Sequence, residues 1–238
     1  MAQAGATVMT GLVGDISIPV FCGSNVGWEG EVDPAKNGTG TFAEVKLSPK
    51  RLTAFVDVSK QFLIQDSNDA EAMLKRDIVN AISDKLEATI LGDEAGSNVM
   101  PEGMFYNVPT DGTKIKYEDV VDMEAMLELA NVTGNISYIV SPRAKATLRT
   151  TRMDAGSGRF VMEGNEVDGY PVYSSSAVTD KGMVIGNFND YVIAQWGAID
   201  LTVDPYTQAA NGKIRLVINA YFDAKPRRAE AFVKKVLL

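Results

Sequence analysis

The stretch VSKQFLIQDSNDAEAMLKRDIVNAISDKLEATILG, residues 58–92, decides the fold. It crosses an acidic turn and then predicts the longest amphipathic helix of the chain, residues 68–91. Asn68 suits the N-cap because Glu71 can complete a capping box, and Gly92 is a stop signal. A helix of this length spans about 35 Å, which suits a scaffold between two sheets. Its predicted apolar face consists of Leu74, Ile78, Ala81, Ile82, Leu86, Thr89 and Ile90.

The composition indicates a globular chain. Its 238 residues are 45% hydrophobic, which is ordinary for a protein with a real core. The longest apolar runs, residues 191–194 and 216–218, are far shorter than the roughly 20 residues of a membrane span. The start has neither a basic region nor a continuous apolar one, so we predict no secretory signal and expect an intracellular chain, at least when it is made.

The residue types exclude several chemistries. Cys22 is the single cysteine and there is no histidine, which excludes an internal disulfide, Ser-His-Asp or Cys-His catalysis and histidine-based zinc sites. We therefore expect no catalytic residues, no cofactor-binding residues, no cofactor and no metal ligands. The net charge of -8 argues against sequence-independent binding of nucleic acid. An acidic shell facing DNA without binding it remains compatible with this charge.

Upstream of the helix, residues 1–26 predict an extended arm that is either flexible or held by another subunit. Residues 27–57 predict a long hairpin, with strands at 28–32, 42–47 and 52–58 and a Gly-rich tip. In the last strand Leu52, Ala54, Val56 and Val58 alternate with polar or outward residues. A plain surface hairpin is the commoner use of such a pattern. The functional alternative is a loop that lies over a neighbouring subunit.

Downstream, residues 97–116 predict a turn-rich link to a second subdomain of mixed α/β character. A helix at 118–130 precedes a buried strand at 136–140, and Ser141 with Pro142 starts a helix at 143–152. Asn211 and Gly212 predict a two-residue hairpin turn. Short strands are expected at 159–162, 170–174, 183–185, 191–195 and 199–203, and longer ones at 213–223 and 229–237.

Three patterns could indicate a site, and each has a simpler explanation. The Gly-rich loops at 11–14, 92–103 and 156–158 lack the Lys-Ser/Thr ending of a phosphate cradle and fit turns. The acidic clusters lack the spacing of a calcium loop. One helix carries a run of cations that could bind an anion, although a solvated or subunit-facing surface is the favoured interpretation; these cations are Arg143, Lys145, Arg149 and Arg152, with Arg159 just beyond.

The ordered set of sequence phrases resembles one family, the major capsid proteins of tailed phages with the Hong Kong 97-like fold, which encapsulin shells share. The phrases begin with WEGE (28–31), the run from FAEVKLSPK (42–50) to the ILGD that ends at residue 93, and PEG (101–103). They continue with YIVSPRAKATLRT (138–150), GRFV (158–161), GYPVYSS (169–175) and VIGNFNDYVIAQWGAIDLTVD (184–204). The resemblance covers nearly the whole chain from about Pro19.

The resemblance implies an α+β Hong Kong 97-like capsid fold in four parts. These are an N-terminal arm (1–26), an extended E-loop hairpin (27–57), a peripheral P-domain (58–113 and 200–226) holding the long spine helix, and an axial A-domain (114–199 and 227–238) with a central mixed sheet. The family assembles into pentamers and hexamers of an icosahedral phage head around double-stranded DNA, with the E-loop of one subunit lying on the next.

The partners implied are therefore copies of the chain itself, and other capsid or scaffolding components are possible. The shell would enclose DNA without binding it sequence-specifically, and no membrane partner is implied. The implied location is the virion, after synthesis in the bacterial host cytoplasm. An encapsulin-like nanocompartment shell is the alternative function, and an enzyme of unknown chemistry is a distant third.

The sequence departs from the family in two ways, and each leads to a prediction. Relatives often have a scaffolding segment ahead of the arm, so this chain looks mature, trimmed or served by a separate scaffold. Some members crosslink through an E-loop Lys and a P-domain Asn aided by a Glu. Those positions correspond here to Glu44, Gly212 and Asn219, so the trio is absent. Lys46 and Asn211 lie close to two of these positions in the sequence. The resemblance therefore predicts noncovalent shells.

Overall fold

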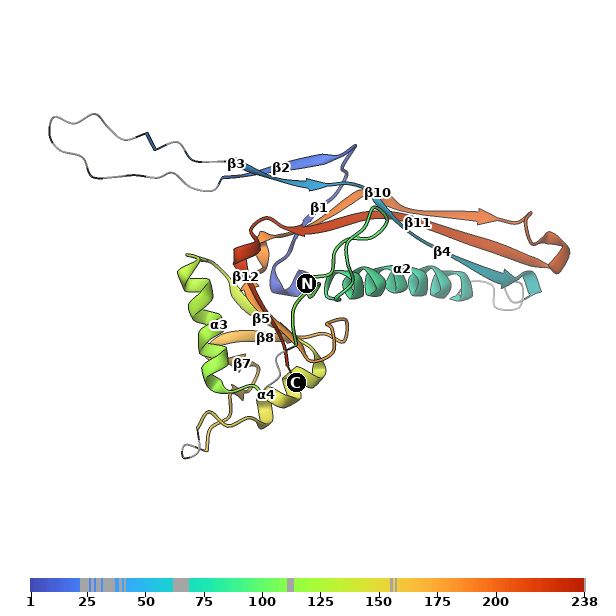
Figure 1. Ribbon diagram of the computed structural model, residues 1–238. Coiled ribbons are helices and arrows are strands. Elements are labelled where there is room, and N and C mark those ends of the chain that lie inside the picture. The colour runs from blue at the N-terminus through green and yellow to red at the C-terminus, as the bar shows by residue number, and fades with distance from the viewer. Residues whose placement is uncertain are drawn as a thin grey trace.

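The computed structural model describes residues 1–21, 26, 28, 31, 37–38, 40, 42–61, 69–110, 114–154, 156 and 158–237. Figure 1 shows an elongated molecule with three parts: a long sheet lined by one helix, a second sheet flanked by shorter helices, and a ribbon that projects from the body. The fold is α+β, as predicted. Among helices in the described ranges, none has the length and apolar character needed to cross a bilayer.

The long sheet has four strands in the order β1-β10-β11-β4. Its centre is β11 (Lys213–Pro226), which pairs antiparallel with β10 (Tyr191–Asp204) and with β4 (Lys50–Ser59). The short strand β1 (Thr7–Met9) adds to β10 in parallel. Of the inward residues predicted in 52–58, Leu52, Val56 and Val58 pack in the core beside the helix, whereas Ala54 is exposed.

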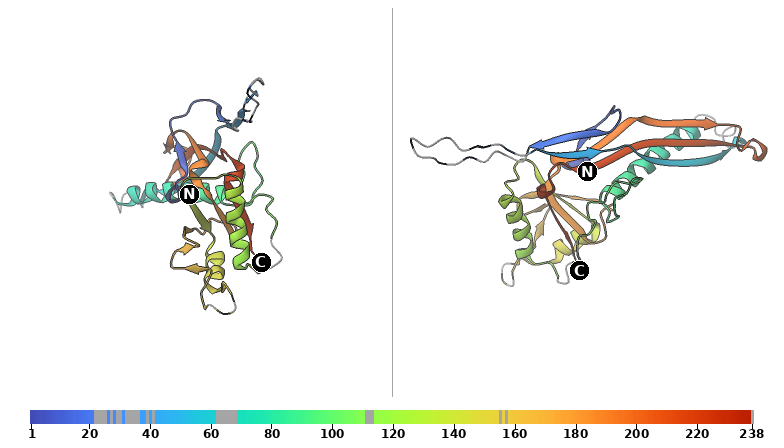
Figure 2. Two further views of the ribbon diagram at one scale, coloured as in Figure 1. Left: turned by 90° about the vertical axis from the view of Figure 1, so that its left-hand side faces the viewer. Right: turned by 45° about the horizontal axis from the view of Figure 1, so that its top comes forward.

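The helix α2 (Asp69–Ile90) lies along this sheet, and Figure 2 shows the two running side by side. Ile78 and Ile82 are 7% and 5% exposed and pack against Leu216 and Ile218 of β11. The prediction was wrong at Ala81, which is exposed. It sits roughly 100° around the helix from Ile82, beyond the strip that the sheet covers. The proposed N-cap, Asn68, lies outside the described residues.

The second sheet has six strands in the order β12-β9-β5-β8-β7-β6. Helix α3 (Tyr117–Leu129) packs on β12 and β9 at one edge, and α4 (Pro142–Thr150) packs on β6 at the other. Ser141 caps α4 by accepting a hydrogen bond from the Ala144 amide at 3.2 Å, as the Ser-Pro pair predicts. The strands are β5 (Ile136–Val140), β6 (Met162–Glu163), β7 (Glu166–Val167), β8 (Tyr170–Ser174), β9 (Gly182–Asn187) and β12 (Phe232–Val236).

Helix α2 also ties the two sheets together. Its last residue, Ile90, and the following Leu91 belong to the core of the six-stranded sheet, while Leu86 packs against both cores. The connection therefore runs through one rigid element, in agreement with a scaffold helix between two sheets. The predicted boundary at residues 199/200 falls inside β10, which is continuous from Tyr191 to Asp204.

The N-terminal segment is held by its own chain, contrary to the expectation of a flexible or partner-held arm. After η1 (Ala2–Ala4) and β1, strand β2 (Ile16–Phe21) pairs antiparallel with β3 (Phe42–Leu47). Apolar side chains of the segment, including Met9 and Ile18, pack on Val192, Ala194 and Trp196. Sequence periodicity missed this because each strand is short. Most of residues 28–32, the expected first strand of the hairpin, lies outside the described residues.

Two further expectations changed at the end of β10. Instead of two strands there is one, with a register shift between Trp196 and Asp200, where Gly197 has φ 66°. Asn211 and Gly212 do not form a two-residue turn: they end η3 (Ala209–Asn211), within a longer connection from Asp204 to Lys213. The longer connection is stabilised by Asp204, whose carboxylate binds backbone amides of the turn. The remaining short 3₁₀ turns are η2 (Phe188–Asp190) and η4 (Ala229–Ala231).

Candidate functional site

Within the described ranges no three His, Cys, Asp or Glu side chains gather as metal ligands. The cations of α4 also do not converge on one point. Arg143 pairs with Asp180 at 2.8 Å, Lys145 donates to Asn165 at 3.3 Å, and Arg159 pairs with its neighbour Glu163. These residues are directed at separate partners, which does not support the anion-site hypothesis.

The surface that stands out is the projecting ribbon β2–β3. Its two strands pair from Ile16 with Leu47 to Phe21 with Phe42. At the far end Phe21 and Phe42 are 51% and 73% exposed, and their ring centroids lie 5.0 Å apart. Two exposed aromatic rings, tilted by 50° to each other where the paired strands end, expose more apolar surface than one chain needs. This end of the ribbon is therefore a candidate contact surface for another protein molecule.

The root of the ribbon is anchored by a buried carboxylate. Asp223 of β11 is 1% exposed and accepts from the Lys50 ammonium at 2.6 Å and from the Ser48 amide at 3.1 Å. Lys50 itself is only 10% exposed. On the adjoining backbone, the Lys225 ammonium donates to the carbonyl of Lys46 at 2.9 Å. These bonds hold the start of β4 against β11, so the ribbon leaves the body in a fixed direction.

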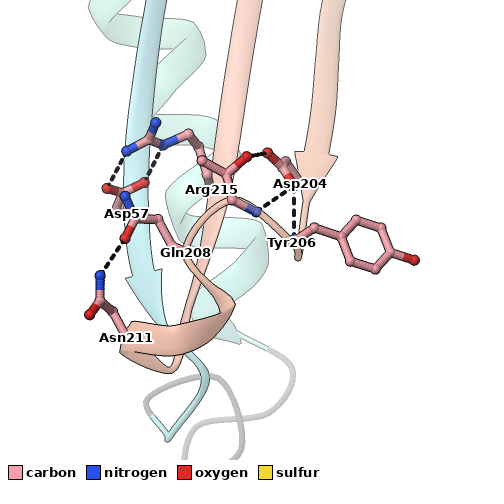
Figure 3. A network of polar contacts seen from close by, with 7 residues as sticks. Asp57, Asp204, Tyr206, Gln208, Asn211 and Arg215 are labelled. Atoms are coloured by element: carbon pink, nitrogen blue, oxygen red, sulfur yellow. Dashed lines mark hydrogen bonds and ion pairs between the residues drawn. The ribbon is translucent and has the colours of Figure 1, made fainter.

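The opposite end of the long sheet carries a second polar network (Figure 3). The Arg215 guanidinium binds both carboxylate oxygens of Asp57, at 2.7 and 2.8 Å, and lies 4.3 Å from the centroid of the Phe55 ring. The hydrogen bond from Arg215 lowers the pKa of Asp57 below its usual value. This bidentate pair joins β4 to β11 near the point where β4 ends and β11 begins.

Beyond it, the turn between β10 and β11 is held by side chains. Asp204 accepts from the amides of Tyr206 at 2.8 Å and Thr207 at 3.1 Å, and also from the Thr207 hydroxyl. Asn211 donates to Gln208 at 2.7 Å. Tyr206 points away from this network in Figure 3 and is 85% exposed. A hydrogen-bonded turn therefore presents an aromatic side chain outward at the tip of the sheet.

A third cluster lies between α3 and the six-stranded sheet. Glu124 accepts from the Tyr138 hydroxyl at 2.8 Å, and Asp168 accepts from the Tyr117 hydroxyl at 3.2 Å. Burial raises the pKa of Glu124 to about 7, opposed by the Tyr138 hydrogen bond and reinforced by the charge of Asp168. Burial also raises the pKa of Tyr138. The two hydrogen bonds, one part-buried and one exposed, fasten α3 to its sheet.

The positions that correspond to the family's crosslinking residues lie far apart within one chain. Glu44 and Lys46 are on β3, 58% and 78% exposed, with their charged atoms 3.9 Å apart. Gly212 ends the turn at the opposite end of the long sheet, and Asn219 lies between them on β11, paired with Thr53 and Asp200. Asn211, next to Gly212, therefore does not meet Lys46 within the chain.

Sequence reasoning missed Asp223 and the Asp57–Arg215 pair. Asp223 interrupts the apolar run at the end of β11, and a carboxylate within such a run signals a buried partner. Asp57 and Arg215 belong to strands 158 residues apart in sequence, so only their cross-strand pairing brings them together.

Comparisons with known proteins agree on one family. The model of the phage capsid family matches residues 1–236. The major capsid protein of Halomonas phage phiHAP-1 is 30% identical over 238 residues, which cover 98% of this chain and 39% of that protein. The major capsid protein of Klebsiella oxytoca phage phiKO2 is 24% identical over 208 residues, 77% of this chain and 48% of that protein. The chain thus spans less than half the length of these curated relatives.

Solved structures show the same fold. A structure described as the capsid of a native GTA particle superposes with a TM-score of 0.78 at 18% identity, covering 99% of this chain and 88% of that one. A structure from Gordonia phage Cozz superposes with a TM-score of 0.76 at 14% identity, covering 100% and 85%. At such identities the likeness establishes the fold.

Proposed function

Because this chain belongs to the phage capsid family, we propose that it is the shell-forming part of a major capsid protein, which self-assembles into the pentamers and hexamers of an icosahedral phage head. The observation that carries the proposal is the projecting ribbon with its exposed aromatic end, fixed to the body by the buried Asp223–Lys50 pair. The ribbon packs on the body at its base through Leu47, Ile16 and Ile18, while the exposed rings of Phe21 and Phe42 are available to a neighbouring copy. Repeated head-to-tail contacts of this kind close into rings.

The proposal assigns a role to each part of the chain. Residues 1–26 form the arm, 27–57 the E-loop, 58–113 and 200–226 the peripheral P-domain, and 114–199 and 227–238 the axial A-domain. In support, the long sheet and α2 make an extended plate, and the six-stranded sheet makes a separate block joined to it through the end of α2. A plate and a block of this kind can occupy the rim and the centre of a capsomer.

The proposed contents are double-stranded DNA, enclosed without sequence-specific binding. The net charge of -8 supports weak contact, because an acidic lining repels the phosphate backbone and lets packaged DNA move. The proposed location is the virion, after synthesis in the bacterial host cytoplasm. An encapsulin-like shell is not favoured, since the family match and the curated relatives are phage capsid proteins. Membership in a structural family also favours a non-enzymatic role.

Negative-stain electron microscopy of the purified protein tests the proposal. Closed shells, or free five- and six-membered rings, are expected. A protein that remains monomeric over a range of protein and salt concentrations would refute it. Shells that enclose a co-purifying enzyme and no DNA, when produced in the phage's host, would instead support the compartment alternative.

A further inference from the structure

The two helices of the six-stranded sheet differ in charge. Helix α3 contains five carboxylates (Glu118, Asp119, Asp122, Glu124 and Glu128) and no Lys or Arg. Helix α4 contains Arg143, Lys145 and Arg149 and no acid, and Arg152 follows it directly. Helix α3 packs on β12 and β9 at one edge of the sheet and reaches across it to Tyr138 of β5 and Asp168 after β7, while α4 packs on β6 at the other edge. Figures 1 and 2 show them on different sides of this block.

The outer face of α3 is apolar as well as acidic. Val121, Met126 and Leu129 are 40%, 56% and 83% exposed; Leu129 lies opposite the buried stripe of Val120, Met123 and Leu127, and Val121 and Met126 lie on its two flanks. Asp122 and Glu128 border these three side chains, and neither makes an ion pair with another described residue. The exposed face of α3 therefore mixes apolar side chains with unpaired carboxylates, and a partner of opposite charge could cover both.

The exposed surface around α4 carries the opposite charge to that of α3. Arg149 and Arg152 are exposed and make no ion pair within the described ranges, in contrast to Arg143 with Asp180. Phe160, 38% exposed, pairs with Arg152 through a backbone bridge and adds apolar surface there. The aliphatic stems of the two arginines can cover the apolar side chains of α3 while their guanidinium groups reach its carboxylates.

We propose that the outer face of α3 (Val121, Asp122, Met126, Glu128 and Leu129) docks on the basic face of α4 (Arg149, Arg152 and Phe160) of a second copy of this chain. An α3-to-α3 contact would oppose carboxylates with carboxylates, which costs several-fold in affinity. A contact from one edge of the sheet to the opposite edge of the next copy repeats around an axis and closes a ring. The inference rests on the proposed shell function and specifies one of its contacts.

Glu118 is left out of the surface for a geometric reason. It lines a shallow cavity together with Arg152 of its own chain, where the two helices approach each other at one end. Reversing its charge would therefore change interactions within the subunit as well as between subunits. Asp122 and Glu128 do not line that cavity, but Arg152 does and Glu128 lies near Glu124, so the melting temperature of each variant is needed to separate effects within the subunit from effects on the contact.

The test is a charge exchange. D122K/E128K and R149E/R152E are each expected to lower the association constant at this contact by at least about tenfold and to abolish ring formation in dilute salt. The chain carrying all four substitutions should regain ring formation, because the signs are again opposite. Sedimentation velocity and negative-stain microscopy measure the assembled fraction, and thermal melting followed by circular dichroism confirms that every variant is folded.

A matched control separates contact from net charge. Asp77 and Asp84 are exposed carboxylates on α2, so D77K/D84K changes the total charge by the same amount. Combined with R149E/R152E, it should not restore rings. Rescue by both pairs, or normal assembly of the double variants, would overturn the proposed contact while leaving the shell function intact. Failure of the unmodified chain to assemble would instead remove the shell function, and this contact with it.

Discussion

At the scale of single residues, buried charge is concentrated where the ribbon leaves the body. Asp223 and Lys50 are both removed from water and compensate each other at 2.6 Å. The exposed pair Arg143–Asp180 has a similar distance, 2.8 Å, but both side chains are more than half exposed, so solvent screens it. Burial, and not separation, decides how much each pair contributes to stability.

We expect D223N to lower the free energy of unfolding by about 3 kcal/mol, because Lys50 would be left as a buried charge without a counter-ion. Urea denaturation followed by circular dichroism measures the change. D180N is the matched control, since it removes a carboxylate from the exposed pair and should cost less than about 1 kcal/mol. Equal effects of the two substitutions would show that the Asp223–Lys50 pair is not structurally important.

Glu124 gives the protein a predicted pH dependence. The pKa is about 7 in the folded chain and 4.5 is the ordinary value, so the folded state holds the proton more tightly. This contribution to stability is therefore fully present below pH 4.5 and is lost as the pH rises to about 7. Asp168, Glu128, Tyr138 and Tyr170 surround the carboxyl group and set the size of the effect.

We expect E124Q to remove this dependence. The difference in unfolding free energy between the native protein and E124Q should decrease as the pH rises from 4.5 to 7. Denaturant titrations across that range measure it. The control E118Q removes an exposed carboxyl group from the same helix and should leave the profile unchanged. Parallel profiles for the native protein and E124Q would show that Glu124 does not titrate in this way.

At the scale of elements, α2 is stabilised by its packing against β4 and β11. Ile82 is 5% exposed in that interface, while the adjacent Ala81 is exposed. Two neighbouring positions thus lie in opposite environments, which allows a direct test of the helix orientation.

We expect I82D to place an unpaired charge in the α2 interface and to cost several kcal/mol, enough to prevent folding. A81D should cost less than about 1 kcal/mol, mostly through the lower helix propensity of Asp. Soluble yield and melting temperature measure both. An unchanged melting temperature for I82D, or equal losses for the two variants, would contradict the observed orientation of α2.

At the scale of the whole molecule, folding and assembly depend on different surfaces. The cores lie within the two sheets and along α2, and the ribbon contributes the buried Leu47 together with Ile16 and Ile18, which pack against it. The exposed end of the ribbon can therefore change without affecting the cores.

We expect deletion of residues 32–41 to leave the protein folded but to block shell formation, because the loop that should lie on a neighbour is removed. Thermal melting and electron microscopy measure the two properties separately. As a control, replacing the same residues by a Gly-Ser segment of equal length tests whether the side chains or only the length are needed. Normal particles from the deletion would refute the role given to this loop.

We also expect assembled particles to dissociate completely into single chains on a denaturing gel. The resemblance places Glu44, Gly212 and Asn219 at the family's crosslinking positions, and with these residues we expect no such bond. A ladder of bands of higher mass that survive boiling would contradict this prediction. The variant K46A would then show whether Lys46 supplies the amine of the crosslink. Reduced samples should give the same pattern.

The amino-acid sequence by itself determined the helix α2, most of the alternation of β4, the cap of α4 and the family. These features depend on local periodicity, on caps or on ordered phrases, which are readable along the chain. The tertiary structure alone decided that the N-terminal segment pairs with β3 and β10, that Ala81 lies outside the packed face, and that residues 191–204 form one strand. Each depends on partners distant in sequence.

The same division holds for the candidate contact surfaces. Composition alone argued against Ser-His-Asp and Cys-His catalysis and against an internal disulfide, because the chain has no histidine and one cysteine. The anchor of the ribbon, the Asp57–Arg215 pair and the opposite charges of α3 and α4 at two edges of one sheet required the fold. Their energies come from burial and distance, and neither quantity exists until strands far apart in the sequence have paired.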